Sequence, residues 1–200
     1  MNSPLFEFVP FAGRLSIESV WARRAPIDIA HGSNWYRDAA RTIADRIPTA
    51  FEPACAIVAV LSPRLEWSEN LLLAETLVTG GARDRGLERN WDKACQILHR
   101  SRRGYKWEHL ITGPKVSAFY RCLLGRKPEP WVIDTHMVSI HHGYPYRDRI
   151  SIRQHASIAL DYETWYQGLT FHRATALTRS QIQATLWLVW KRRFLPHMKG

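Results

Sequence analysis

The run FEPACAIVAVLS at residues 51–62 is almost wholly apolar, and it restricts how this chain can fold. It is too short for a transmembrane helix, which needs about 20 apolar residues. It therefore predicts a helix that is buried on all sides at the centre of a core, although its valines and isoleucine leave a buried strand open. No segment offers 18 consecutive apolar residues, so the sequence predicts no membrane span.

Helical spacing of apolar residues surrounds this run, and strong strand pairs are absent, so we expect an all-α protein. The patterns predict helices over 34–47, 66–81, 90–101, 105–112 and 115–125, an extended start and then a helix over 131–143, and two helices from about residue 151. Ser33 or Asn34 is the expected N-cap of the first helix, and Ser180 that of the last. Residues 1–16 are expected to be irregular, because they contain Pro4, Pro10 and Gly13.

The chain has 200 residues, 46% of them hydrophobic, which fits one domain or two tightly fused lobes. We expect one domain over 1–200, with a lobe at about 50–142 and a second lobe built from the N-terminal helices and residues 150–200. The N-terminus lacks the charged start and long apolar core of a signal peptide, so we expect a cytoplasmic, nucleoid-associated protein. Three scattered cysteines without a CxxC pattern predict neither a disulfide framework nor a zinc site.

Lysine and arginine outnumber aspartate and glutamate by 28 to 18, which gives a formal net charge of +10 and a pI near 9.9. Such an excess on a globular chain indicates an anionic partner, most often nucleic acid. A basic protein without such a partner remains the alternative. A membrane surface is disfavoured, because no single basic amphipathic helix dominates the sequence.

The candidate functional residues lie mainly in one segment, residues 113–137, which reads GPKVSAFYRCLLGRKPEPWVIDTHM. It begins at a glycine turn that the pattern places between two short helices. Backbone amides at such a turn and at the following helix N-terminus have no acceptor within the helix, so they can hold a DNA phosphate. Taken alone, Lys115 is a solvated lysine at a helix start and Asp134 is an N-cap. The His141–His142 pair lacks a third ligand at a useful spacing, so we expect no metal site there.

The segment resembles the hairpin-to-aspartate segment of the helix-hairpin-helix DNA glycosylases, most closely the 8-oxoguanine glycosylase branch and more loosely endonuclease III. In that superfamily a Gly-x-Lys at the hairpin precedes a helix, a Pro-containing loop and a Val-Asp-x-His segment. Here these positions are Gly113, Lys115 and residues 133–136. The resemblance covers about residues 50–142, and 155–195 more loosely. It implies two helical lobes around a DNA-binding cleft.

The hairpin departs from the usual Leu-Pro-Gly-x-Gly, because residues 109–113 read HLITG. The resemblance implies no required cofactor. It allows a monovalent cation at the hairpin carbonyls, which the missing proline and glycine disfavour. The four-cysteine iron–sulfur cluster of endonuclease III is not expected, since three scattered cysteines cannot supply its ligands.

The resemblance makes Lys115 and Asp134 the catalytic residues of a DNA N-glycosylase with AP-lyase activity. A carboxylate at Asp134 would stabilise the oxocarbenium-like transition state. A neutral amine at Lys115 would attack the anomeric carbon and form a Schiff base, which permits strand cleavage. The expected partner is double-stranded DNA with a damaged or modified base, because a base must leave the stack before excision. We expect the protein to act as a monomer.

Further residues are expected around this pair. The expected DNA contacts are Thr112, Gly113, Val116, His136 and Arg64, the last entering the stack where the base leaves; the expected pocket residues are Phe119 and Trp67. The resemblance favours oxidised guanine as the base and leaves a bulky modified base open. Two alternatives remain: an enzyme on hypermodified bases or nucleotides that reuses the same lysine and aspartate, and a non-catalytic helix-hairpin-helix DNA-binding module.

Overall fold

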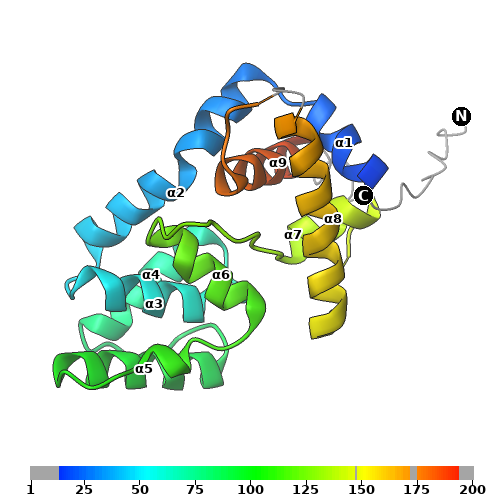
Figure 1. Cartoon of the computed structure of the whole chain (residues 1–200). Helices are drawn as coiled ribbons and strands as arrows, with labels where there is room; N and C mark the ends of the chain where they lie inside the picture. The colour runs from blue at the N-terminus through cyan, green and yellow to red at the C-terminus, as the bar shows by residue number, and fades with distance from the viewer. Residues whose placement is uncertain (1–13, 147, 172–174, 194–200) are drawn as a thin grey trace, which may run out of the picture. The chain divides into compact units, whose positions relative to one another are not determined.

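The computed structural model describes residues 14–146, 148–171 and 175–193, and every regular element in these ranges is a helix (Figure 1). This confirms the all-α prediction. The elements are α1 Arg14–Ala22, α2 Pro26–Arg46, α3 Phe51–Leu61, α4 Trp67–Val78, α5 Glu88–Arg102, the 3₁₀ turn η1 Glu108–Leu110, α6 Pro114–Leu123, α7 Thr135–His142, α8 Ile152–Phe171 and α9 Arg179–Arg193. No described helix is both long and apolar enough to cross a membrane.

The chain divides into two compact units. Residues 34–132 form one of them, the hairpin unit, and residues 1–33 with 133–200 form the other, the terminal unit. The boundaries differ from the expected lobe at 50–142 at both ends. Most of α2 belongs to the hairpin unit, and α7 belongs to the terminal unit because it packs on α1 and α9.

The hairpin unit is built around α3, which contacts α4, α5 and α6 (Figure 1). Every residue from Pro53 to Leu61 is buried, so the apolar run is the central helix and not a strand. Alanines at 54, 56 and 59 are fully buried, and such small side chains let neighbouring helices approach closely. The 51–62 run thus forms the helix on which α4, α5 and α6 pack.

Helix ends follow the sequence signals in part. The predicted helix over 66–81 is α4, whose N-cap Glu66 forms a reciprocal capping box with Glu69, and the chain leaves it at Gly80 with φ 85°. The predicted N-cap at Ser33 or Asn34 is wrong, because α2 already begins at Pro26. The Ser33 hydroxyl instead donates to the Ile29 carbonyl at 2.6 Å, one turn back within the helix.

The predicted helix over 105–112 is also wrong, since only the 3₁₀ turn η1 forms there. α5 ends at Arg102, and Gly104 has φ 72°, which turns the chain away from the helix axis. Trp107 is then buried, with its ring edge-on to Tyr120 at 6.2 Å. Burial of this indole outweighs the local helical pattern. The glycine turn before α6 is therefore preceded by a loop with one 3₁₀ turn, not by an α-helix.

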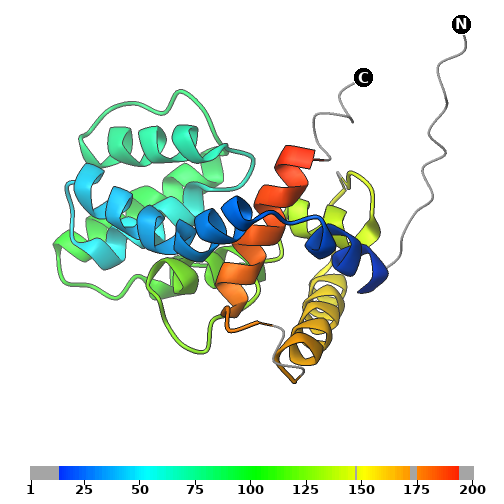
Figure 2. The ribbon, with the colours of Figure 1, turned by 90° about the horizontal axis from the view of Figure 1, so that it is seen from above.

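In the terminal unit α1 contacts α7, α8 and α9, and α7 also contacts α9 (Figure 2). The buried carboxylate of Asp28 accepts from the Ala25 amide at 2.7 Å and pairs with Arg192 of α9. The predicted N-cap Ser180 lies inside α9; the Thr178 amide donates to the Gln181 side chain at 2.9 Å, in the manner of a capping box. The prediction of an irregular 1–16 fails from Arg14 onward, and residues 1–13 lie outside the described residues.

Gly32 of α2 packs closely against Thr185 of α9 in the terminal unit. A Cβ built on it would lie 2.1 Å from Thr185 Oγ1 and 2.6 Å from the Thr185 backbone nitrogen. Gly32→Ala is therefore expected to lower the free energy of unfolding by about 1–3 kcal/mol, although alanine favours a helix by up to about 1 kcal/mol. Urea unfolding measures this; a variant more stable than the wild type would show that propensity outweighs the clash.

Candidate active site

The N-terminus of α6 lies at the expected hairpin. Gly113 is the N-cap with φ 90°, a conformation that side chains with a Cβ rarely adopt, and Pro114 occupies the first helical position. The Ser117 amide donates to the Gly113 carbonyl at 3.0 Å, which closes the first turn. The helix dipole adds partial positive charge at this end, where Thr112, Gly113 and Pro114 are exposed and Val116 is half-buried. The end can thus bind an anion.

The Lys115 side chain is half-buried and held in place by the hairpin unit. Its Nζ donates to Ser62 Oγ at 2.5 Å, across 53 residues of sequence, and lies 5.4 Å from the centre of the Phe119 ring. The Ser62 hydroxyl donates in turn to the Ala59 carbonyl at 2.8 Å. These two hydrogen bonds anchor the Lys115 amine on the C-terminal end of the central helix α3. Lys115 is therefore not the solvated lysine that a helix start alone would suggest.

The turn after α3, whose Ser62 contacts the Lys115 amine, is strained at Arg64. Arg64 is exposed and has φ 68°, the positive-φ conformation that costs a residue with a Cβ about 1–2 kcal/mol. Non-glycine residues held in this region concentrate at functional sites. The residues from Ser62 to Arg64 therefore present an exposed guanidinium on the same turn that contacts Lys115.

Thr112, the residue before the N-cap Gly113, is in contact with Lys93. Lys93 of α5 donates to Thr112 Oγ1 at 2.6 Å, across 19 residues, and this contact joins α5 to the residue before Gly113. The carbonyls of Trp107 and Glu108, just before the hairpin residues 109–113, accept backbone hydrogen bonds from Leu110 and Ile111.

The two expected pocket residues belong to one aromatic cluster. Trp35 lies between them, with ring centres 5.4 Å from Trp67 and 6.2 Å from Phe119, and Tyr36 lies 6.2 Å from Phe119. Phe119 is only 7% exposed, so it packs in this cluster and does not form an open wall. The cluster adjoins the Lys115 amine through the Phe119 ring.

In the terminal unit Asp134 caps α7. Its Oδ1 accepts from the Met137 amide at 2.9 Å, which is the expected N-cap geometry, and the side chain is half-buried. Tyr162 is fully buried and donates from its hydroxyl to the Met137 carbonyl at 2.8 Å. Burial first, and the negative charge of Asp134 second, raise the pKa of Tyr162. The ring of His136 lies edge-on to that of Trp187, with centres 5.7 Å apart.

The structure thus groups the sequence-predicted site residues in two sets. The hairpin unit holds Lys115, Thr112, Gly113, Val116, Arg64, Phe119 and Trp67; the terminal unit holds Asp134 and His136. Sequence reasoning missed Ser62 as the partner of the lysine, Lys93 at the hairpin, and Trp35 and Tyr36 in the aromatic cluster. Only the apolar periodicity of residues 34–47 hinted at the last two.

Among the described residues, no group of three or more His, Cys, Asp or Glu side chains is arranged to hold a metal ion. The His141–His142 pair lies in the last turn of α7. His141 Nε2 lies 2.8 Å from Asp161 Oδ2, and the ring of His142 stacks on Tyr146. All three cysteines are free thiols.

The chain matches a protein-family model over most of its length. A model described as "Family of unknown function (DUF7178)" matches residues 13–194. No curated protein and no solved structure matches the chain.

Proposed function

The chain belongs to DUF7178, a family of unknown function, and we propose that it is a DNA N-glycosylase that also cleaves the strand at the abasic site. In this proposal the all-α chain adopts the helix-hairpin-helix glycosylase fold and acts as an intracellular monomer on double-stranded DNA with a damaged or modified base. Lys115 is the nucleophile, and Asp134 stabilises the positive charge that develops on the sugar.

The contact between Lys115 and Ser62 is the observation that carries the proposal. It joins three features that a base-excision site needs. They are an anchored amine, a helix N-terminus that can bind the phosphate, and an exposed arginine in a strained turn that can enter the stack. The separation of 19 residues between Lys115 and Asp134, which resembles that of the 8-oxoguanine glycosylase branch, and the net charge of +10 also support this function.

The chemistry balances with the residues of this chain. The C1′–N bond breaks and its electron pair leaves with the base. Lys115 Nζ forms the new bond to C1′, and the proton that the amine gives up goes to the departing base. Opening of the sugar ring then breaks the C1′–O4′ bond and gives an imine, as a second amine proton passes to O4′. Loss of a proton from C2′ and cleavage of the C3′–O bond complete the β-elimination, and water releases the lysine. The negative charge of Asp134 would offset the positive charge on the sugar throughout.

The function is tested with a panel of duplexes that each carry one altered base, scored for base release with and without alkali. Release of one base, with strand cleavage that needs no alkali, is the expected result. Cleavage only after alkali would show a glycosylase without lyase activity. If no duplex loses a base while DNA binding persists, the chain is a non-catalytic DNA-binding module.

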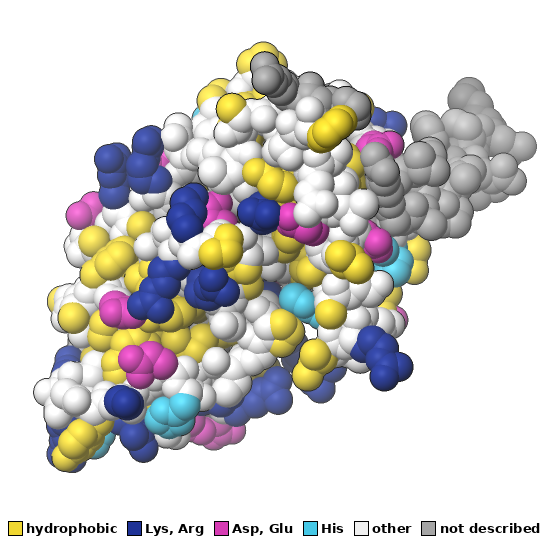
Figure 3. All heavy atoms as spheres, in the orientation of Figure 1, with side chains coloured by type: hydrophobic (Ala, Val, Ile, Leu, Met, Phe, Trp, Pro, Cys, Tyr) yellow, Lys and Arg dark blue, Asp and Glu magenta, His cyan; other side chains and the backbone are white. Residues whose placement is uncertain are grey.

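An enzyme on free or hypermodified nucleotides is the alternative. The salt dependence of duplex binding distinguishes it from an enzyme that acts on duplex DNA. A protein that neutralises phosphates releases counterions, so log Kobs falls linearly with log salt, with a slope of about −0.9 for each phosphate contacted. Lysine and arginine side chains are spread over the face shown in Figure 3 and are not gathered in one patch. The affinity for duplex DNA, and not the surface charge alone, therefore decides this point.

Ser62→Ala tests the anchoring of the lysine. Loss of one hydrogen bond is expected to cost about 0.5–1.5 kcal/mol, and hence to slow base release by roughly 2- to 10-fold. The variant still forms its covalent adduct at Lys115, because the amine remains. Single-turnover kinetics measure the rate, with Ser68→Ala as a matched control at an exposed serine of α4. An unchanged rate for Ser62→Ala would mean that the contact does not position the nucleophile.

A further inference from the structure

The C-terminal end of α5 carries a tight turn, residues 100–105, which we call the α5 turn. The Tyr105 amide donates to the Arg100 carbonyl at 2.9 Å. The Gly104 amide donates to the Ser101 carbonyl at 3.1 Å, and Gly104 has the positive φ, 72°, that this pattern needs. These two hydrogen bonds form a Schellman motif, which holds the backbone of the turn in one conformation.

The Tyr105 ring is positioned by this motif and yet left open to solvent. In a Schellman motif the residue at this place commonly packs its side chain on the last turn of the helix. Tyr105 is instead 60% exposed, although the neighbouring rings of Trp107 and Tyr120 are buried. An aromatic ring that the fold positions but does not bury can stack against another flat ring.

The α5 turn is positively charged. It contains Arg100, Arg102 and Arg103, and none of the three forms an ion pair with a carboxylate in the part of the chain that the structure describes. The acidic residue nearest to the turn along the sequence is Glu108. It accepts from the Trp107 amide at 3.1 Å, and backbone hydrogen bonds lower its pKa. One carboxylate against three guanidinium groups leaves an excess of positive charge, which suits an anionic partner.

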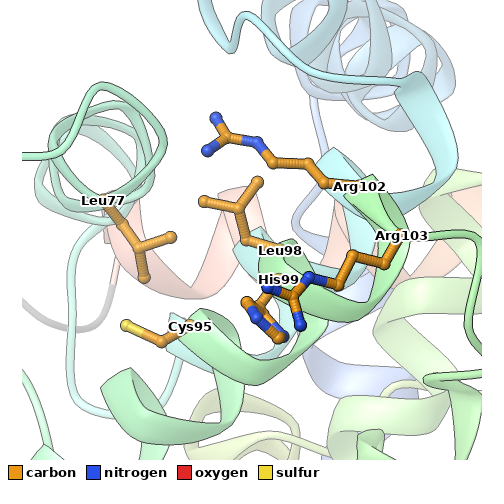
Figure 4. A pocket seen from close by; sticks show the side chains of 6 residues that line it. All are labelled: Leu77, Cys95, Leu98, His99, Arg102 and Arg103. Atoms are coloured by element: carbon orange, nitrogen blue, oxygen red, sulfur yellow. The ribbon is translucent and has the colours of Figure 1, made fainter.

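The arginine side chains of the turn do not converge on one point. Figure 4 shows them beside a mainly apolar pocket of about 250 Å³ between α4 and α5. Arg102 extends toward α4, where its Nη2 donates to the Val78 carbonyl at 3.2 Å, whereas the Arg103 guanidinium lies beside the His99 ring. This arrangement does not enclose a single phosphate. It fits a partner whose negative charges are distributed along a chain.

The helix itself explains only part of this composition. Cations in the last turn of a helix offset the partial negative charge of its C-terminus, and Arg100 and Arg102 lie in the last turn of α5. That effect involves no aromatic ring, so it does not account for the exposure of Tyr105. A partner that brings both negative charge and flat rings would use every feature of the turn.

We propose that the α5 turn binds single-stranded DNA, with one unpaired base stacked on Tyr105 and the neighbouring phosphates held by the arginines. Proteins that bind single strands combine a cationic surface along the backbone with aromatic rings on which bases stack. The bases of a duplex are already stacked on one another and are not available to the ring. The α5 turn shares no residue with the proposed active site, so this inference goes beyond the glycosylase activity and does not depend on it.

The test compares the affinity of the full-length protein for two chains of equal charge, an oligomer of about eight thymidines and an abasic chain of the same length. Tyr105→Ala is expected to weaken binding to the thymidine oligomer at least about 5-fold, because the stacked base is lost. Binding to the abasic chain is expected to change less than about 2-fold, since that chain offers only phosphates. An unchanged affinity for the thymidine oligomer, or an equal loss on the abasic chain, overturns the proposal.

Matched tyrosine variants assign the effect to the ring. Tyr105→Phe keeps the ring and is expected to bind as the wild type does. Tyr144→Ala, at a 37% exposed tyrosine of the terminal unit, is expected to keep its affinity as well. If Tyr105→Phe binds as weakly as Tyr105→Ala, or if Tyr144→Ala loses as much affinity, no base stacks at the α5 turn. Equal thermal midpoints show that each variant remains folded.

Two further ligands define the partner. Tyr105→Ala is expected to bind a duplex of the same length as tightly as the wild type does; a loss equal to that on the single strand would contradict the preference for unpaired bases. An oligomer of the same number of uridines in RNA is expected to bind no more tightly than the thymidine oligomer. Tighter RNA binding that depends on Tyr105 would assign the surface to RNA and overturn the proposal.

The contribution of charge is measured by salt dependence. Each phosphate neutralised on a single strand adds about −0.7 to the slope of log Kobs against log salt. Arg103→Ala is expected to make the slope less steep by about that amount on both the thymidine and the abasic chain. Arg89→Ala, at an exposed arginine in the first turn of α5, is expected to leave the slope unchanged. Equal slopes for Arg103→Ala and the wild type would show that the turn holds no phosphate and would refute the proposal.

Discussion

Lys115→Ala is expected to lower base release by on the order of 10³-fold or more and to abolish strand cleavage, because it removes the nucleophile from the reaction. The side chain is half-buried and contacts Ser62 and Phe119, so some loss of stability accompanies the change. Single-turnover assays on the duplex identified in the base panel measure the loss. Thermal unfolding shows that the variant remains folded.

Two further variants separate nucleophilicity from charge. Lys115→Arg keeps a cation near Ser62 but cannot form a Schiff base, since a guanidinium is not deprotonated, so it is expected to be as inactive as alanine. Lys106→Ala, at an exposed lysine of the same unit, is expected to remain active. Substantial strand cleavage by Lys115→Arg would show that the lysine acts through its charge and that the chemistry lies elsewhere.

Asp134→Asn is expected to lower base release by roughly 10²–10³-fold, because the charge that offsets the oxocarbenium ion is lost. Asparagine is as good an N-cap as aspartate, and its side-chain oxygen can still accept from the Met137 amide. The free energy of unfolding should therefore change little. This substitution removes the charge and retains the cap.

Asp134→Ala removes both the negative charge and the N-cap of α7. It is therefore expected to show the same loss of base release and to lower the free energy of unfolding by about 1 kcal/mol as well. Urea unfolding and single-turnover kinetics on the two variants separate the two contributions. If Asp134→Asn retains the rate of the wild type, Asp134 is only the N-cap of α7, and the electrostatic role assigned to it is wrong.

The elements that the sequence predicted are those in which local pattern and packing agree. Residues 51–62 carry enough apolar surface to predict a buried helix. For α4, Glu66 and Glu69 mark the beginning of the helix, and the glycines after Thr79 mark its end. Where the two conflict, packing decides. Residues 105–112 have a helical pattern, but burying Trp107 against Tyr120 requires a loop with one 3₁₀ turn.

The site shows the same division. Gly113 and Lys115 lie two residues apart along the chain, so their position at a helix start followed from the glycine, the proline and the apolar spacing. The contact of Lys115 with Ser62 depends on how α6 packs on α3, and nothing in the local sequence encodes a partner 53 residues away. The positive φ of Arg64 likewise arises from closing the turn between α3 and α4.

The central claim is that Lys115 forms a covalent bond to the sugar, and borohydride trapping on a duplex with an abasic site tests it most directly. Borohydride reduces the imine to a stable amine, so the wild-type protein is expected to become cross-linked to the DNA, with the adduct on the peptide that contains Lys115. Lys115→Ala is expected to give no adduct. An absence of adduct with the wild type, or equal trapping of Lys115→Ala, would contradict the account.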